Sequence, residues 1–147
     1  MTIKTRKAQV VIATIDSNRQ FYFLLLQTNK KRGEFWQNIT GKVEEGETIE
    51  EGALREAIEE TGMQIESIVD IIDLGMSYQF NDQHGRKVDE KCFLIILDGK
   101  WDIKLDPHEH QNYQWITLDN LSEGSVKYTS NFETLKKAQH ILKHWGQ

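Results

Sequence analysis

The chain has 147 residues, of which 38% are hydrophobic and 28% charged, and its formal net charge is −5. This length is enough for one hydrophobic core, so a single domain over residues 1–147 is expected. No apolar run approaches the length of a membrane span, and the N-terminus lacks the hydrophobic segment of a signal peptide. The single cysteine cannot form an internal disulfide. The composition therefore argues against a membrane partner and predicts a cytoplasmic location.

The acidic charge is concentrated in one stretch of the chain. Residues 44–60 hold eight Glu and one Arg, which leaves 15 acidic and 17 basic residues elsewhere. No concentrated basic stripe with interleaved aromatic residues is present, so a polynucleotide-binding track is not expected. This distribution favours a small polyanionic ligand that metal ions join to the protein.

Two strands are predicted before the acidic stretch. Residues 7–16 (KAQVVIATID) and 21–27 (FYFLLLQ) are rich in β-branched, aromatic and aliphatic side chains, and they flank a turn at residues 16–18. They are therefore expected to form an antiparallel pair. Residues 35–43 then bring a short extended segment into the acidic stretch.

A helix is predicted over residues 49–61. Thr48 and Glu51 have the spacing of a capping box, in which the Thr48 hydroxyl accepts from the Glu51 amide and the Glu51 carboxylate reaches back. Gly62 follows at the position where a residue in the left-handed conformation ends a helix. The sequence thus predicts both ends of this helix.

Three carboxylates converge on one side of the predicted helix, since Glu56, Glu59 and Glu60 fall within about 100° of arc. Clustered carboxylates repel one another unless a cation joins them. Oxygen-only ligands select hard ions such as Mg²⁺, for which Mn²⁺ can substitute. The alternative is a solvated helix face, held by Glu51, Arg55 and Glu59 as a column at i, i+4 spacing.

Further elements follow the predicted helix. Strands are predicted over residues 65–80, 87–98 and 112–118. Cys92 lies in the apolar run CFLIIL and is expected to be a buried thiol. Residues 131–145 place their apolar side chains on one face, which predicts an amphipathic C-terminal helix. We therefore expect a fold of the α/β class, in which one mixed sheet lies between helices.

Residues 41–63 (GKVEEGETIEEGALREAIEETGM) resemble the signature of the Nudix hydrolases at every fixed position. The spacing is G-x5-E-x7-R-E-A-x-E-E-x-G-M, and its fixed residues are Gly41, Glu47, Arg55, Glu56, Glu59, Glu60 and Gly62. These matches make the solvated surface helix the weaker interpretation. The resemblance implies an α/β/α sandwich with a mixed β-sheet.

The resemblance also implies roles for the charged residues of the signature. Glu56 and Glu60 are expected to be metal ligands, and Glu59 is expected to be a ligand or to activate water. Arg55 is expected to hold Glu47 and thereby to orient the ligands.

Two further metal ligands are implied outside the helix. The carbonyl of Thr40, just before the signature glycine, is expected to complete the coordination. Glu109 is the candidate for an acidic ligand from a later loop, and its alternative is a solvent-exposed loop acid. His108 and His110 flank it, but no Cys or third His lies nearby, so exposed histidines are favoured over a zinc site.

The sequence around the signature favours one branch of the family. FWQNITGKVEEGET, EHQNYQW and TSNFETLKKA resemble the branch that cleaves dihydroneopterin triphosphate and nucleoside triphosphates to a monophosphate and pyrophosphate. Other branches usually carry a proline before the signature glycine, whereas the single proline here is Pro107. Residues 77–89 match this branch poorly, and Phe80 among them is a candidate for contact with the pterin or base.

Contacts with substrate are predicted at Lys7, Trp36, Thr40, Phe80 and Ser130. Lys7 matches a phosphate-contacting position of that branch but is equally consistent with an ordinary edge lysine. Trp36 could stack on a heterocycle or belong to the core. Ser130 or Asn131, at the start of the last helix, could meet the ligand, and Ser130 could instead cap that helix.

The sequence therefore predicts a Mg²⁺-dependent pyrophosphohydrolase whose partner is a small-molecule phosphoanhydride, either a pterin or a (deoxy)nucleoside triphosphate. One alternative is a hydrolase of nucleoside diphosphate derivatives, such as a dinucleoside polyphosphate, ADP-ribose or a nucleoside diphosphate sugar. Another is a Nudix-fold binding module that has lost catalysis. Such modules usually lose signature carboxylates, and this sequence retains all of them.

Overall fold

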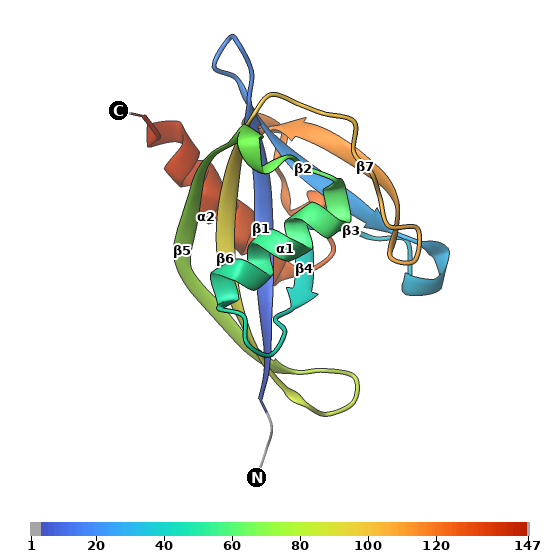
Figure 1. The fold of residues 1–147 in the computed structure, drawn as a ribbon. Coiled ribbons are helices and arrows are strands. Elements are labelled where there is room, and N and C mark those ends of the chain that lie inside the picture. Colours follow the sequence, from blue (N-terminus) through green and yellow to red (C-terminus); the bar gives the residue numbers. More distant parts are fainter. Residues whose placement is uncertain (1–3, 147) are drawn as a thin grey trace.

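A computed structural model describes residues 4–146, and in it a mixed β-sheet lies between two helices (Figure 1). The strands are β1 (Thr5–Ile15), β2 (Phe21–Thr28), β3 (Trp36–Gln37), β4 (Ile39–Lys42), β5 (Ile68–Asn81), β6 (Lys87–Asp98) and β7 (His110–Thr117). The helices are α1 (Ile49–Thr61) and α2 (Thr129–His144), one on each face of the sheet. This arrangement confirms the expected α/β/α sandwich.

Strand β1 organises the sheet. It pairs in parallel with β6 along its whole length, and the other strand pairs are antiparallel. Along its other edge the neighbour of β1 changes. Residues 7–10 pair with β4 and residues 12–15 pair with β2. The chain crosses from β3, which pairs with β2, to β4, which pairs with β1, at Asn38.

Two hydrophobic cores cover the opposite faces of the sheet. Because successive side chains of a strand point to opposite faces, Val10 and Ile12 of β1 pack with α1, whereas Val11 and Ala13 pack with α2. The C-terminal helix contributes its buried apolar residues to the second core, as its predicted amphipathic pattern requires. Cys92 is fully buried there, which confirms the prediction for that thiol.

Helix α1 has the predicted bounds because both of its ends are determined locally. The capping box between Thr48 and Glu51 is present in both directions. Gly62 ends the helix in the left-handed conformation with φ of 68°, and its N–H donates to the carbonyl of Ile58.

Other element boundaries differ from the predicted ones. Helix α2 begins at Thr129 after Tyr128, whose side chain makes no capping hydrogen bond, so Ser130 lies inside the helix and does not cap it. Residues 65–67 form a 3₁₀ turn before β5 begins. Across residues 4–146, no helix is long and apolar enough to cross a membrane.

Candidate metal and hydrolysis site

Arg55 joins the loop before α1 to the acidic side of that helix. Its Nε and Nη2 atoms donate to the two oxygens of Glu47 at 2.8 and 3.0 Å, which is a bidentate pair. Its Nη1 donates to Glu56 at 3.0 Å and to Glu59 at 3.2 Å. Its Nη2 also donates to the carbonyl of Lys42 at 2.9 Å. The structure thus places Arg55 and Glu47 together, as the signature implied.

The pair with Arg55 determines the charge state of Glu47. Hydrogen bonding to Arg55, followed by the backbone N–H of Glu44, lowers the pKa of the Glu47 carboxyl. Hydrogen bonding to Glu47 in turn raises the pKa of Arg55. This ion pair therefore holds the loop before the helix to α1. The third guanidinium nitrogen, Nη1, bonds to Glu56 and Glu59.

We expect Arg55→Lys to lower the hydrolysis rate by about 10- to 100-fold, the range typical of residues that orient metal ligands. Lysine keeps the charge but cannot serve Glu47, Glu56 and Glu59 together, because it lacks the planar fork. The measurement is kcat as a function of Mg²⁺ concentration. Arg19→Lys, at an exposed position of the β1–β2 turn, is the control. An unchanged rate in Arg55→Lys would show that Arg55 only forms ion pairs on the helix surface and does not orient the metal ligands.

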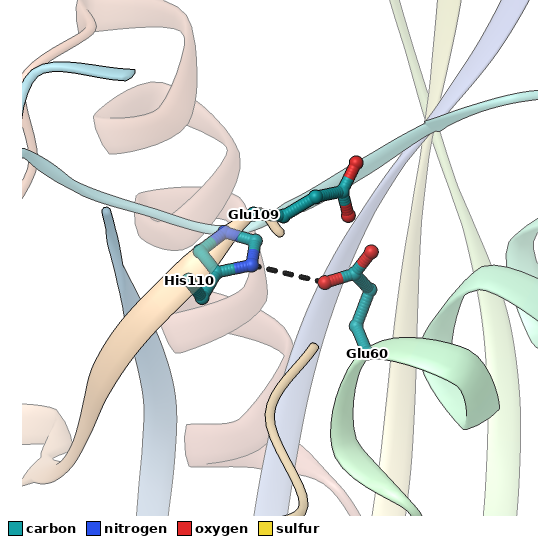
Figure 2. Close-up of side chains that lie close together, drawn as sticks. All are labelled: Glu60, Glu109 and His110. Atoms are coloured by element: carbon teal, nitrogen blue, oxygen red, sulfur yellow. Dashed lines mark hydrogen bonds and ion pairs between the residues drawn. The ribbon is translucent and has the colours of Figure 1, made fainter. Parts of the chain in front are cut away.

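Glu60, Glu109 and His110 form an acidic cluster where α1 ends beside the start of β7. Single ligand atoms of Glu60, Glu109 and His110 all lie within 4.8 Å of one another. Figure 2 shows the carboxyl groups of Glu60 and Glu109 facing each other, with His110 bonded to Glu60. Hydrogen bonding to the Glu60 carboxyl, together with burial, raises the pKa of Glu109 to about 7. Burial raises the pKa of Glu60 as well. It is therefore unfavourable for both neighbouring carboxyl groups to carry a negative charge at the same time.

His110 is buried, and the expectation of an exposed histidine is therefore wrong; His108 is exposed as expected. The His110 ring lies between two partners, with Nδ1 at 2.9 Å from Glu60 and Nε2 at 2.9 Å from the Gln37 amide nitrogen. Burial, followed by the charge of Arg32, lowers the pKa of His110 to about 4. The ring is therefore neutral, and its Nδ1–H donates to Glu60 while Nε2 accepts from Gln37.

Glu56 lies directly against the backbone of the signature glycine. A Cβ atom at Gly41 would overlap the Glu56 carboxyl group, so only glycine allows this approach. The same closeness brings Glu56 beside the Thr40–Gly41 peptide, where the Thr40 carbonyl was expected to act as a ligand. Burial raises the pKa of Glu56 despite its hydrogen bond to Arg55.

The donor set of this site fits a hard divalent cation. Glu56, Glu60 and Glu109 offer carboxylate oxygens. The pKa of each is raised, by burial for Glu56 and Glu60 and first by the hydrogen bond to Glu60 for Glu109, so a bound cation would stabilise their charged forms. Glu59 is more exposed and is held at the rim by Arg55. The Nδ1 atom of His110 is already hydrogen-bonded to Glu60, so the atoms that can coordinate a cation are mainly carboxylate oxygens. Oxygen ligands favour Mg²⁺ or Mn²⁺ over zinc.

A cleft with a volume of about 540 Å³ adjoins the acidic cluster. Its lining includes Gln37, which contacts His110, and Thr40, which precedes the glycine that touches Glu56. The complete lining consists of Lys7, Arg32, Phe35, Gln37, Thr40, Tyr78, Gln79, Phe80, Glu90, Tyr128, Ser130 and Asn131. The cleft therefore offers two cations, several aromatic faces and a few polar groups.

Four of the five predicted substrate positions line this cleft, namely Lys7, Thr40, Phe80 and Ser130. Trp36 does not line it but packs against the core on the α2 side, which supports the core alternative for that residue. Sequence reasoning did not single out Arg32, Gln37 or Glu90. Only the position of Gln37 in the segment before the signature glycine could have drawn attention to it.

Known proteins share this fold and are similar in sequence over most of the chain. The family model for the NUDIX domain matches residues 4–137. The chain is 29% identical over 141 residues to a dihydroneopterin triphosphate diphosphatase of Haemophilus influenzae, covering 87% of this chain and 83% of that protein. It is 30% identical over 118 residues to an octanoyltransferase of Myxococcus xanthus, covering 78% of this chain but only 31% of that much longer protein.

A solved structure agrees over nearly the full length. The crystal structure of a C. elegans Ap4A hydrolase binary complex has a TM-score of 0.79 to this chain at 27% sequence identity, and the match covers 96% of this chain and 99% of that one. The family model also spans the Arg55 ion pairs, the acidic cluster and every lining residue of the cleft. The chain therefore belongs to the Nudix hydrolase family.

Proposed function

We propose that this Nudix hydrolase is a Mg²⁺-dependent pyrophosphohydrolase that cleaves a pterin or (deoxy)nucleoside triphosphate to the monophosphate and pyrophosphate, with residues 1–147 as one catalytic domain. The observation that carries the proposal is the position of the cleft, which combines cations with aromatic side chains directly beside the acidic cluster. The likeness to the Haemophilus influenzae dihydroneopterin triphosphate diphosphatase over most of both chains supports it.

The residues of the site divide into two groups in this proposal. Glu56, Glu60 and Glu109 would hold the cation, with Glu59 at the rim to accept a proton from the attacking water. A bound divalent cation lowers the pKa of its water and neutralises phosphoryl oxygens. Arg32 lies near both the cleft and the cluster, since its charge acts on Glu60, Glu109 and His110.

The other group binds the substrate. Lys7 and Arg32 offer positive charge to the phosphate chain from the cleft wall. Phe35, Phe80 and Tyr128 offer aromatic faces on which a flat heterocycle can stack. The Phe35 and Tyr128 rings meet edge to face with centroids 5.3 Å apart, so they form one continuous apolar wall.

A hydrolase of nucleoside diphosphate derivatives is the second candidate, and the similarity to the C. elegans Ap4A hydrolase favours it. The absence of a proline before Gly41 argues against this branch. A catalytically inactive binding module is the third candidate. The intact Arg55 network and the converging carboxylates argue against it, because a module without catalysis has no need of them.

We expect dihydroneopterin triphosphate to be hydrolysed more efficiently than ATP, with dGTP as the closest competitor. The products should be the monophosphate and pyrophosphate, because the cluster grips the phosphate chain while the ring occupies the aromatic part of the cleft. The measurement is product analysis with Mg²⁺, with and without added pyrophosphatase. Orthophosphate released without pyrophosphatase would reject this cleavage position. A clear preference for ADP-ribose or a dinucleoside polyphosphate would reject the substrate class but keep the family assignment.

A further inference from the structure

Two turns at one end of the sheet carry charged groups of the proposed site, and they lie side by side (Figure 1). The first turn, residues 29–35 between β2 and β3, carries Arg32, which lines the cleft. The charge of Arg32 also acts on Glu60 and Glu109 in the acidic cluster. The second turn, residues 106–109 before β7, carries Glu109 itself. The arrangement of the two turns therefore determines where Arg32 and Glu109 lie relative to the cleft and the cluster.

Asn29 closes the turn that carries Arg32. Its side-chain Oδ1 accepts from the N–H of Arg32 at 3.0 Å, and its carbonyl oxygen accepts from the N–H groups of Arg32, Gly33 and Glu34, each at 3.1 Å. Two successive residues of this turn are in the left-handed conformation, Gly33 with φ of 113° and Glu34 with φ of 57°. A residue other than glycine adopts that conformation at a cost in free energy, so it persists where the surrounding structure requires it. The hydrogen bonds of Asn29 hold this strained turn in place.

Asn29 also holds the turn that carries Glu109. Its main-chain N–H donates to the carbonyl of Glu109 at 3.0 Å, and its side-chain Nδ2 donates to the carbonyl of Pro107 at 3.1 Å. Within that turn, the N–H of Glu109 donates to the carbonyl of Asp106. In the described part of the chain, both hydrogen bonds that reach the main chain of residues 107–109 from another segment come from Asn29.

The side-chain amide of Asn29 satisfies both turns in one orientation. The N–H of Arg32 can only donate, so it requires the amide oxygen. The carbonyl of Pro107 can only accept, so it requires the amide nitrogen. Serine is as good a capping residue as asparagine, but its hydroxyl lies at the place of the amide carbon and is too short to serve both partners. Substitution by serine therefore separates the cap from the bond to the second turn.

We propose that Asn29 is a positioning residue that joins the two turns and thereby sets Arg32 against the phosphate chain and Glu109 against the metal-binding cluster. Asn29 does not line the cleft and does not belong to the acidic cluster, so it acts through Arg32 and Glu109. This inference rests on the proposed triphosphate hydrolysis and adds a residue on which the binding of both substrate and cation depends.

The alternative is that Asn29 only caps the short 3₁₀ helix Lys30–Arg32, of which it is the N-cap residue. Serine and aspartate are equally good caps. Under this alternative, Asn29→Ser and Asn29→Asp would both behave like the wild-type protein in the binding of cation and substrate.

The first test is the binding of Mn²⁺ alone to Asn29→Ser, measured from the signal of free Mn²⁺ in electron paramagnetic resonance. Binding should weaken by about 5- to 10-fold, the effect of one hydrogen bond, because the turn with Glu109 loses its bond at Pro107. Asn29→Asp should also bind Mn²⁺ more weakly, although its new charge by itself would attract the cation. Asn18→Ser, at an exposed position of the β1–β2 turn, is the control. Wild-type Mn²⁺ binding in Asn29→Ser would overturn the proposal.

The second test is a double-mutant cycle between Asn29 and Arg32. Arg32→Gln should raise KM for the best triphosphate by about tenfold in the wild-type background, because one charged hydrogen-bond donor to phosphate is lost. In the Asn29→Ser background the same change should raise KM by less than about threefold, because Arg32 is no longer held in place. Equal factors in the two backgrounds would contradict the proposed joint. Circular dichroism and Tm verify the fold of each variant.

Mn²⁺ binding separates this inference from the proposed hydrolysis, because it requires no turnover. If the protein hydrolyses no triphosphate, the proposed function fails, while the Mn²⁺ affinity of Asn29→Ser still decides on the role of Asn29. If triphosphates are hydrolysed and Asn29→Ser binds Mn²⁺ like the wild-type protein, the role of Asn29 is refuted and the proposed function remains.

Discussion

Glu60→Gln should lower the Mg²⁺-dependent release of pyrophosphate by about 10²-fold or more while the fold stays intact. The Glu60 side chain is only 4% exposed and lies close to Glu109, so a neutral amide there removes one of the buried carboxylates that are proposed to hold the cation. Glutamine keeps the shape and an oxygen that can accept from Nδ1–H of His110. The measurement is kcat for the best triphosphate, with circular dichroism and Tm to verify the fold.

Glu59→Gln separates chemistry from structure. This side chain is 56% exposed, and among residues 4–146 its hydrogen bond and ion pair are with Arg55, so a large loss of activity there cannot arise from a disturbed core. We expect a loss similar to that of Glu60→Gln. Glu50→Gln is the matched control, because Glu50 lies exposed on the same helix outside the acidic cluster. Activity close to wild type in both Glu59→Gln and Glu60→Gln would refute the metal-site interpretation.

The sequence predicted those parts of the fold that local interactions determine. Helix α1 has the predicted bounds because Thr48, Glu51 and Gly62 act within one turn of its ends. Strand β6 also has the predicted bounds, and Gly99, in the left-handed conformation with φ of 80°, follows its last residue. The start of α2 was misplaced because Tyr128 leaves it without the side-chain cap that a sequence reader looks for.

The charged part of the site was predictable for a similar reason. Arg55 meets Glu47 across only eight positions, and the signature spacing encodes that contact. The structure also weakens the alternative of a solvated column on the helix surface. Glu51, the proposed first member of that column, bonds back to Thr48 in the capping box, and Arg55 directs its fork at Glu47.

The contacts that the sequence could not predict join segments that are distant along the chain. His110 pairs with Glu60 across 50 positions, and Gln9 pairs with Glu90 across 81. No local pattern distinguishes a histidine that will be buried against a carboxylate from an exposed one. The parallel pairing of β1 with β6 creates the second contact, and no sequence period reveals which strands will be neighbours.

The last prediction concerns the glycine of the signature. Gly41→Ala should reduce turnover by about 10²-fold, because displacement of a catalytic group by about 1 Å is enough for such a loss. The backbone at Gly41 is not in the left-handed region, so alanine fits the conformation, but its Cβ would overlap the Glu56 carboxyl group. That group is the end of a flexible side chain and can move aside. The Tm should therefore change little while Glu56 loses its place beside Thr40 and its bond to Arg55.

Gly124→Ala is the control for this change, since Gly124 also lies outside the left-handed region and a Cβ there meets only Ser122 Oγ, at 3.9 Å. The two variants make the same chemical change, and they differ in whether the added methyl group touches the acidic cluster. Turnover should fall in Gly41→Ala alone, with a weaker response to Mg²⁺ because Glu56 is displaced. Wild-type turnover in Gly41→Ala would mean that the position of Glu56 against the Thr40–Gly41 peptide is not required for hydrolysis, and the Thr40 carbonyl would then lose its proposed part in the metal site.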